Sequence, residues 1–312
     1  MNKFNYNETY LNESFFDDIE DDITDNNIIG KDIYNITLHN IIKVKNDEDI
    51  LKLRINQKVY NKYGNFIEYK TNPDKISQIN LSNYDLTTCV GMFANNTKLT
   101  NIDLSLLDLS NVDNISNMFY DCNNLESISF PEDNKISILG NTFNSCSSLK
   151  HIDLSNIKLP IKNTYGLFKG CHNLQDIDVS MLNTINIQDM SNMFAWCLSL
   201  KTLDLSNFRT DHAITMSSMF ESCMELTELD LSSFDLSNCI NMARMFMNCQ
   251  NLTTLDIRNF KPINPILGGW DNIFYNCKSL KYITCSKEFK KFIMDNKKTM
   301  AFKCTHVKWN YI

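Results

Sequence analysis

The chain has 312 residues, 43% of them apolar and 21% charged, which is enough apolar sequence for a large folded core. Its formal net charge of −7 argues against a nucleic-acid-binding protein, because such proteins usually carry a basic surface. No apolar stretch reaches the ~18 residues of a membrane-spanning helix. The N-terminus also lacks a secretory signal pattern, so we expect a cytoplasmic or otherwise intracellular protein without a membrane span.

Residues 1–31 are predicted to form an acidic, disordered tail. Residues 1–30 contain eight Asp or Glu residues against one Lys, and this excess equals the net charge of the whole chain. A segment with that much charge and so few apolar residues does not bury enough surface to fold.

Residues 32–75 are predicted to form a β-rich N-terminal cap. Apolar and polar residues alternate around Leu53 and Ile55 and again at Val59, with Gly64 in a candidate hairpin turn. The segment could also hold an enzyme, but it is short for an ordinary fold and contains one His and no Cys. We therefore rank an enzymatic function last and expect neither catalytic residues nor a cofactor.

Residues 76–285 contain a repeat of 24 to 28 residues, which predicts about eight units of a solenoid. One Phe marks each unit, with the same pattern around it. These are Phe93, Phe119, Phe143, Phe168, Phe194, Phe220, Phe246 and Phe274.

Each unit changes its apolar period once. Between Met190 and Cys197 apolar residues recur at spacings of three, four and seven, which predicts a helix face. From Leu203 to Leu205 they alternate with polar residues, which predicts a short strand. The predicted fold is an α/β repeat solenoid, a right-handed stack of strand–turn–helix units with a parallel sheet on one face. We attribute the 43 Asn residues mainly to an A+T-rich genome.

The repeat resembles the BspA-type leucine-rich repeats of bacterial surface proteins, mycoplasma lipoproteins, some protists and giant viruses. The Leu-x-x-Leu-x-Leu of Leu200, Leu203 and Leu205 matches the first half of a leucine-rich repeat, and Met193-Phe194 with Cys197 completes the BspA-type unit. The resemblance implies a curved interaction scaffold, often an adhesin or a host-contact protein, and makes the cell surface the alternative location.

Residues 286–312 are predicted to form a basic C-terminal cap. Ser286 is placed to cap a helix, and a strand is expected near Phe302–Trp309. Residues 281–312 contain eight Lys against Glu288 and Asp295, so this end of the chain is basic. Terminal units of a solenoid need a polar outer face, which both caps supply.

The repeated cysteines and methionines are interpreted as core residues. No Cys-x-x-Cys pair supports a metal site, and helices stacked 8–10 Å apart would keep neighbouring cysteines beyond disulfide distance. We therefore expect buried free thiols, a reducing compartment and no bound metal. The cysteines in question are Cys122, Cys146, Cys171, Cys197, Cys223, Cys249 and Cys277.

Two columns of side chains are the candidate partner-binding surface, because strand alternation places them opposite the buried residues. The acidic column comprises Asp103, Asp153, Asp178, Asp204, Asp230 and Asp256. The flanking column comprises His151, Asp176, Thr202, Glu228, Thr254 and Tyr282. Like charges about one strand apart repel each other, so the carboxylates need compensation. They could accept backbone N–H bonds, meet a partner protein or, least favoured, hold a cation.

The sequence predicts a non-enzymatic protein–protein interaction scaffold that binds another protein through its exposed strand face. The alternatives are a structural or assembly protein of a virion or surface layer, and a surface adhesin. We expect a monomer or a weak homo-oligomer.

Overall fold

The computed structural model describes residues 42–44, 53–55, 58–60, 84–86, 89–97, 99–104, 109–261, 269–304 and 306–311. All of them belong to one compact unit, residues 32–312. The predicted tail, residues 1–31, lies outside the described residues, as does most of the predicted cap at 32–75.

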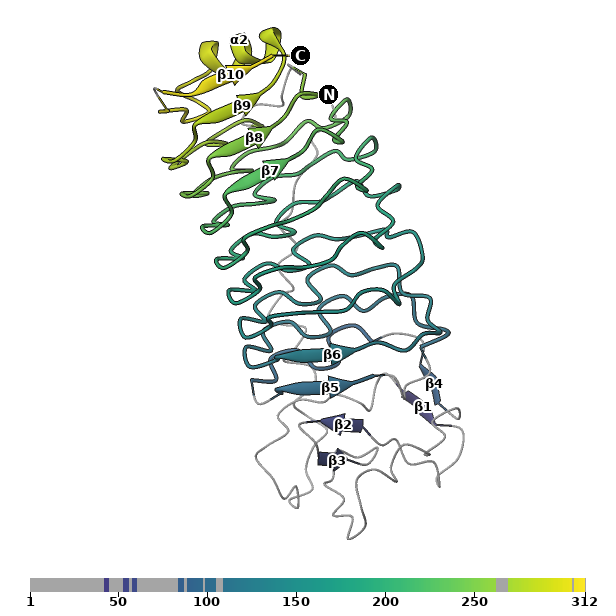
Figure 1. Ribbon diagram of the computed structural model, residues 1–312. Coiled ribbons are helices and arrows are strands. Elements are labelled where there is room, and N and C mark those ends of the chain that lie inside the picture. The colour runs from purple at the N-terminus through teal and green to yellow at the C-terminus, as the bar shows by residue number, and fades with distance from the viewer. Residues whose placement is uncertain are drawn as a thin grey trace, which may run out of the picture. The chain divides into compact units, whose positions relative to one another are not determined.

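The described part of this unit is a parallel β-solenoid of about eight turns, in which each repeat forms one coil that stacks on the next (Figure 1). Its strands are three residues long. They are β1 (Ile42–Val44), β2 (Leu53–Ile55), β3 (Lys58–Tyr60), β4 (Tyr84–Leu86), β5 (Asn101–Asp103), β6 (Ser127–Ser129), β7 (Glu228–Asp230), β8 (Thr254–Asp256), β9 (Tyr282–Thr284) and β10 (Lys308–Asn310).

The strands form two separate sheets on the strand face and one pair beside them. One sheet has the order β3-β2-β5-β6, in which β5 and β6 are parallel and β2 pairs antiparallel with both β3 and β5. The other has the order β10-β9-β8-β7, and all of its pairs are parallel. Strands β1 and β4 pair antiparallel.

The predicted parallel sheet on one face is present but is interrupted in the middle of the stack. Within the continuously described range 109–261, no strand lies between β6 and β7, and beside Ile177 and Leu203 the coils are joined by the bond from the Lys201 N–H to the Gln175 carbonyl. Three-residue strands supply few bonds for holding the coils in register. The opposite side of the coil supplies more bonds, and there the connection is unbroken.

The expectation of a helix in each unit was wrong, because those segments are ladders of turns. In a helix each N–H bonds to the carbonyl four residues back. Here the Met193 N–H bonds to the Met190 carbonyl of its own coil, whereas the next N–H, that of Phe194, bonds to Met219 of the following coil. Apolar residues at spacings of three, four and seven are buried both in a helix and in a series of successive turns. The periodicity of the sequence therefore did not distinguish a helix from turns.

We call this arrangement the turn ladder. It comprises residues 89–97, 114–122, 138–146, 163–171, 189–197, 215–223, 241–249 and 269–277. Two positions in each coil have a positive φ, between 54° and 74°. A side chain there is strained unless it is absent or can bond locally, as in Gly and Asn.

The left-handed positions explain much of the Asn and Gly content of the turn ladder. Asn occupies seven of these sixteen positions and Gly three. At Gly166, where φ is 59°, an added Cβ atom would also meet the side-chain oxygen of Asn141 and displace it. Attributing the Asn content mainly to coding bias therefore missed a structural requirement.

The core is built from stacked Phe rings. The eight repeated Phe side chains are buried and lie one above the other with ring centroids 5.4–6.0 Å apart and ring planes within 18° of parallel. Phe208, Phe234 and Phe260, which follow the strand position in three successive coils, are also buried. Each coil thus buries its apolar stripe only against its neighbours.

The repeated cysteines lie beside the Phe stack as free thiols. Each Sγ donates a hydrogen bond to the carbonyl of the Phe in the preceding coil, for example Cys197 to Phe168 and Cys223 to Phe194, both at 3.2 Å. The coils are therefore much closer together than stacked helices, and helix separation was the wrong reason for expecting free thiols. The Met pairs Met190/Met193 and Met216/Met219 are buried in the core.

The C-terminal end contains the helix α2 (Lys287–Asp295) followed by β10. The Ser286 side chain accepts a hydrogen bond from the Phe289 N–H at 3.0 Å and so caps α2. Phe289 and Ile293 are the buried residues of the helix. In the described part of the chain, no helix has the length and apolar character to cross a membrane.

Candidate protein-binding surface

The two predicted columns lie on the strand face and flank an apolar residue in each coil, which is buried in most coils and half-buried at Ile177 and Leu203. Strand β7 shows the arrangement, with Glu228 and Asp230 exposed on either side of buried Leu229. The pairing of β7, β8 and β9 places Glu228 beside Thr254 and Thr254 beside Tyr282. Of the twelve predicted residues, Asp103, Asp256 and Thr254 are half-buried and the others are exposed. The columns therefore present side chains from successive coils to one side of the solenoid.

The acidic column is tied to the backbone of its own coil. Asp153, Asp178, Asp204 and Asp230 each accept a hydrogen bond through Oδ1 from the N–H two residues later, at 2.8–2.9 Å. The donor in each case is a Ser, and Asp256 uses Arg258 in the same way. Backbone N–H bonds were one of the three expected ways to compensate these charges, and the structure contains them.

At three positions of the column these bonds lower the pKa of the carboxyl group. The Ser155 N–H and hydroxyl hold the pKa of Asp153 below its usual 3.8, against a smaller opposing effect of the Asp178 charge. The Ser180 and Ser206 groups likewise lower the pKa values of Asp178 and Asp204. Hydrogen bonding is therefore the strongest influence on these three carboxyl groups.

The flanking column differs in chemistry from coil to coil. His151 Nδ1 lies 2.9 Å from Asp176 Oδ1 in the next coil. At the other end, the Lys308 ammonium lies 5.7 Å from the centroid of the Tyr282 ring. Between them Thr202, Glu228 and Thr254 present hydroxyl and carboxylate groups. The surface thus combines a regular, backbone-anchored acidic column with a variable one.

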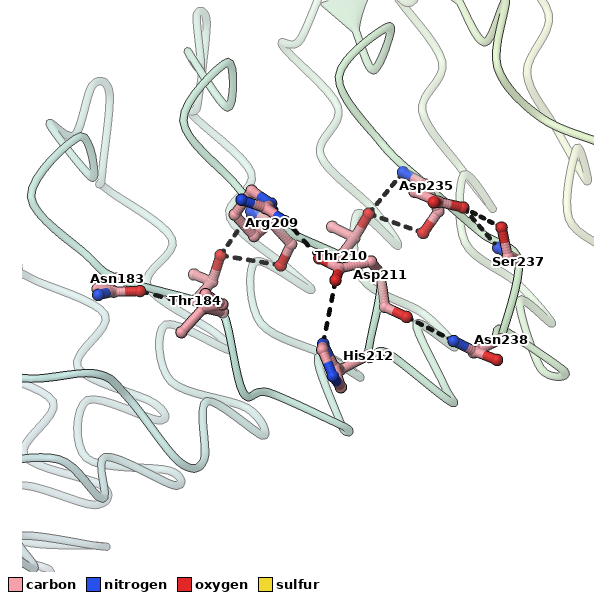
Figure 2. Close-up of polar contacts among 10 residues, drawn as sticks. Asn183, Thr184, Arg209, Thr210, Asp211, His212, Asp235, Ser237 and Asn238 are labelled. Atoms are coloured by element: carbon pink, nitrogen blue, oxygen red, sulfur yellow. Dashed lines mark hydrogen bonds and ion pairs between the residues drawn. The ribbon is translucent and has the colours of Figure 1, made fainter.

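A second polar region lies at the corner that follows the strand face (Figure 2). The Thr184 hydroxyl donates to the Arg209 carbonyl at 3.0 Å and accepts from the Arg209 N–H at 2.8 Å. Thr210 repeats both bonds with Asp235, at 2.9 and 2.8 Å. Each Thr hydroxyl thus bonds to both the N–H and the carbonyl of one residue in the next coil, in place of backbone–backbone hydrogen bonds. The threonines of this corner therefore stabilise the stack of coils.

Asp211 lies beside these threonines. Its carboxylate lies 3.4 Å from Arg209 Nε and 3.2 Å from His212 Nδ1, and its carbonyl accepts from Asn238 Nδ2 at 2.6 Å (Figure 2). Across the described ranges, no group of three or more His, Cys, Asp or Glu is arranged to hold a metal ion.

Sequence reasoning missed two kinds of residue. The Ser in the pattern Asp-x-Ser supplies the N–H to Asp153, Asp178, Asp204 and Asp230, and that spacing was visible in the repeat. The threonines Thr184 and Thr210 also lie 26 residues apart, at equivalent positions. These threonines bond to the neighbouring coil, so the pattern of apolar and polar residues within one unit does not indicate their role. An alignment of the units would have shown that Thr recurs at this position.

The fold and its repeat define a solenoid repeat protein, and comparison with known families specifies the type. The BspA type leucine rich repeat region, in six copies, matches residues 55–190. The family described as Mycoplasma protein of unknown function, DUF285, matches residues 162–284. The chain therefore contains BspA-type leucine-rich repeats, as its resemblance indicated.

Among solved structures, the chain is similar to a leucine-rich cell surface protein from Faecalibacterium prausnitzii A2-165. The two share 16% sequence identity over 73% of this chain and 83% of the other, with a TM-score of 0.25. No curated protein matches the sequence.

Proposed function

We propose that this protein is a non-enzymatic scaffold that binds another protein through the strand face. The observation that carries the proposal is the pair of side-chain columns, repeated coil after coil on one side of the solenoid. Eight coils at ~4.8 Å give this face a length of about 40 Å, comparable with an ordinary protein interface. Solenoid proteins commonly use such extended faces for binding.

The chemistry of the face indicates a partner with basic and polar groups. Asp178, Asp204 and Glu228 are exposed in consecutive coils, whereas the acidic column is neutralised at its C-terminal end, where Arg258 pairs with Asp256. Because the carboxylates are already oriented by Ser N–H groups, they lose little side-chain freedom when a partner binds.

The test replaces Asp178, Asp204 and Asp230 with Asn and compares capture of partners from the lysate of the source cells. Asn keeps the acceptor for the Ser N–H but removes the charge, so the fold survives and binding through the face is lost. The matched control makes the same change to Asn at Asp189 and Asp235. These two residues accept the Ser191 and Ser237 N–H groups in the same kind of turn elsewhere in the coil.

Loss of a specific partner with the triple variant, but not with the control, supports the proposal. If the folded triple variant still captures every partner, the strand face is not the binding site. Capture of the chain alone, with no other protein, would favour the structural or assembly function instead.

We also propose an intracellular, reducing location, which the thiols support. Ten of the eleven cysteines are buried, Cys304 is half-buried, and all are free. Burial raises the pKa of Cys89 and of Cys122 to about 12, so few thiolates are present to react. Fractionation and surface biotinylation of intact cells test this location: labelled protein at the surface would overturn it.

A further inference from the structure

The turn ladder ends at the last coil with an open donor. In the preceding coils the second left-handed residue donates its backbone N–H to the next coil, as Ser222 does to Met247 and Asn248 to Tyr275. In the last coil the corresponding residue is Asn276, with a φ of 62°. The acceptor that would continue the series, the Phe302 carbonyl, does not pair with it among the described residues.

A groove occupies this place. Its volume is about 470 Å³, and it lies between the last turn and strand of the stack, residues 274–281, and the segment around Lys303 and Cys304. The C-terminal segment takes the position of the next coil only in part. The Phe274 N–H still bonds to Met300, the Phe274 ring contacts Phe302, and the Cys304 thiol donates to the Cys277 carbonyl at 2.9 Å. Within the described range 269–304, the ladder bond at Asn276 between these contacts is missing.

The groove is basic. Lys278, Lys281 and Lys303 line it together with His306, and none of the lining residues is acidic. All three lysines are exposed, and the Lys303 ammonium lies 6.0 Å from the centroid of the Tyr275 ring. Each exposed ammonium binds an isolated anion weakly in water, so the groove suits a ligand with several negative charges.

We propose that this groove binds an acidic, extended peptide segment of a partner protein. A peptide carbonyl continues the ladder at the Asn276 N–H, and carboxylates of the peptide pair with Lys278, Lys281 and Lys303. The open backbone donor favours a peptide over a polyphosphate, because main-chain bonding of an added strand is how exposed ladders recognise peptides. This site is separate from the strand face and does not depend on the function proposed for it.

The test measures fluorescence anisotropy of a fluorescein-labelled nine-residue peptide of alternating Glu and Gly, added to the full chain at 50 mM salt. The variant is K278E/K281E/K303E. The matched control is K291E/K297E/K298E, which changes the charge equally at the same end of the chain on exposed residues outside the groove. Far-UV circular dichroism verifies that both variants are folded.

We expect the groove variant to weaken binding at least tenfold and the control less than threefold. Equal losses in both variants, or no binding to the unaltered protein, would overturn the proposal. Displacement of the peptide by an oligonucleotide of equal charge at the same or lower concentration would assign the groove to a polyphosphate instead. Self-association in sedimentation equilibrium that the groove variant abolishes would identify the occupant as a second copy.

Discussion

At the scale of single residues, the solenoid depends on side chains that complete backbone hydrogen bonding. The Asp side chains of the Asp-x-Ser turns and the Thr hydroxyls at the corner bond to backbone groups that a plain strand or helix would have paired. The Asn residues of the turn ladder instead adopt the positive φ that its turns require. An unpaired buried N–H or carbonyl is costly, so the coil retains these particular residue types.

Replacing Thr210 with Val tests the corner. Val has nearly the same shape but cannot bond to the Asp235 N–H and carbonyl, which Thr210 satisfies while almost fully buried. We expect the free energy of unfolding, measured by urea denaturation, to fall by about 1–3 kcal/mol. The same change at exposed Thr202 should alter it by less than about 0.5 kcal/mol. Equal effects at Thr210 and Thr202 would show that the hydroxyl bonds of Thr210 add nothing to the free energy of unfolding.

Replacing Asn192 tests the left-handed positions. Asn192 has a φ of 60°, which a β-branched residue adopts only with strain. We expect Asn192→Val to lower the free energy of unfolding by about 1–2 kcal/mol, and Asn192→Gly to change it by only a few tenths. If Val and Gly behave alike in urea denaturation, backbone strain is not what selects the residue here.

At the scale of the element, the turn ladder replaces the helix of the expected unit. Every second N–H leaves its own coil, and the remainder close turns within it, so a segment such as 189–197 has no stability without its neighbours. The stacked Phe rings and the Cys thiols lie directly behind the ladder and are held at its spacing. Packing and backbone bonding therefore depend on each other.

Replacing Phe220 with Ala tests this coupling. Phe220 is fully buried, with Phe194 and Phe246 stacked on its two sides at 6.0 Å. We expect the resulting cavity to lower the free energy of unfolding by about 3–5 kcal/mol, measured by urea denaturation. Tyr120→Ala is the control, because this aromatic residue is 39% exposed, and its effect should be small. A Phe220→Ala variant as stable as that control would contradict a continuous Phe core.

At the scale of the whole molecule, charge is arranged along the stack. The strand face carries a column of carboxylates, whereas the last coil and the C-terminal segment carry the lysines of the groove. The net charge of −7 conceals this separation. Two surfaces of opposite sign at different places allow the molecule to contact two different kinds of partner.

The carboxylates make stability dependent on pH in a defined direction. Hydrogen bonds from Ser lower the folded-state pKa values of Asp153, Asp178, Asp204 and Asp235 below 3.8. A group with a lowered folded-state pKa stabilises the protein above its unfolded-state pKa, and that contribution is lost as the pH falls. We therefore expect the free energy of unfolding to decrease from about pH 5 to pH 3.

Urea denaturation at a series of pH values checks this prediction. A variant with Asn at those four positions keeps the acceptors but does not titrate, so its stability should fall less over the same interval. An identical pH dependence in the variant and the unaltered protein would assign the acid sensitivity to other carboxyl groups.

The amino-acid sequence determined the repeat, its register and its buried columns, because apolar residues at fixed spacing are buried in any stacked arrangement. It also determined the exposure of most of both candidate columns, since neighbours of a buried residue in an extended segment point the opposite way. The Phe, Leu and Cys columns are where this reasoning placed them, in the core.

Only the tertiary structure decided how the backbone of each unit is bonded. The spacing of Met190, Met193 and Cys197 fits both a helix and successive turns, and the distinction depends on whether an N–H bonds within its own coil or to the next one. The interrupted sheet, the Thr corner and the open groove depend on the neighbouring coil in the same way. A single repeat does not contain that neighbour, and therefore the pattern within one repeat could not predict them.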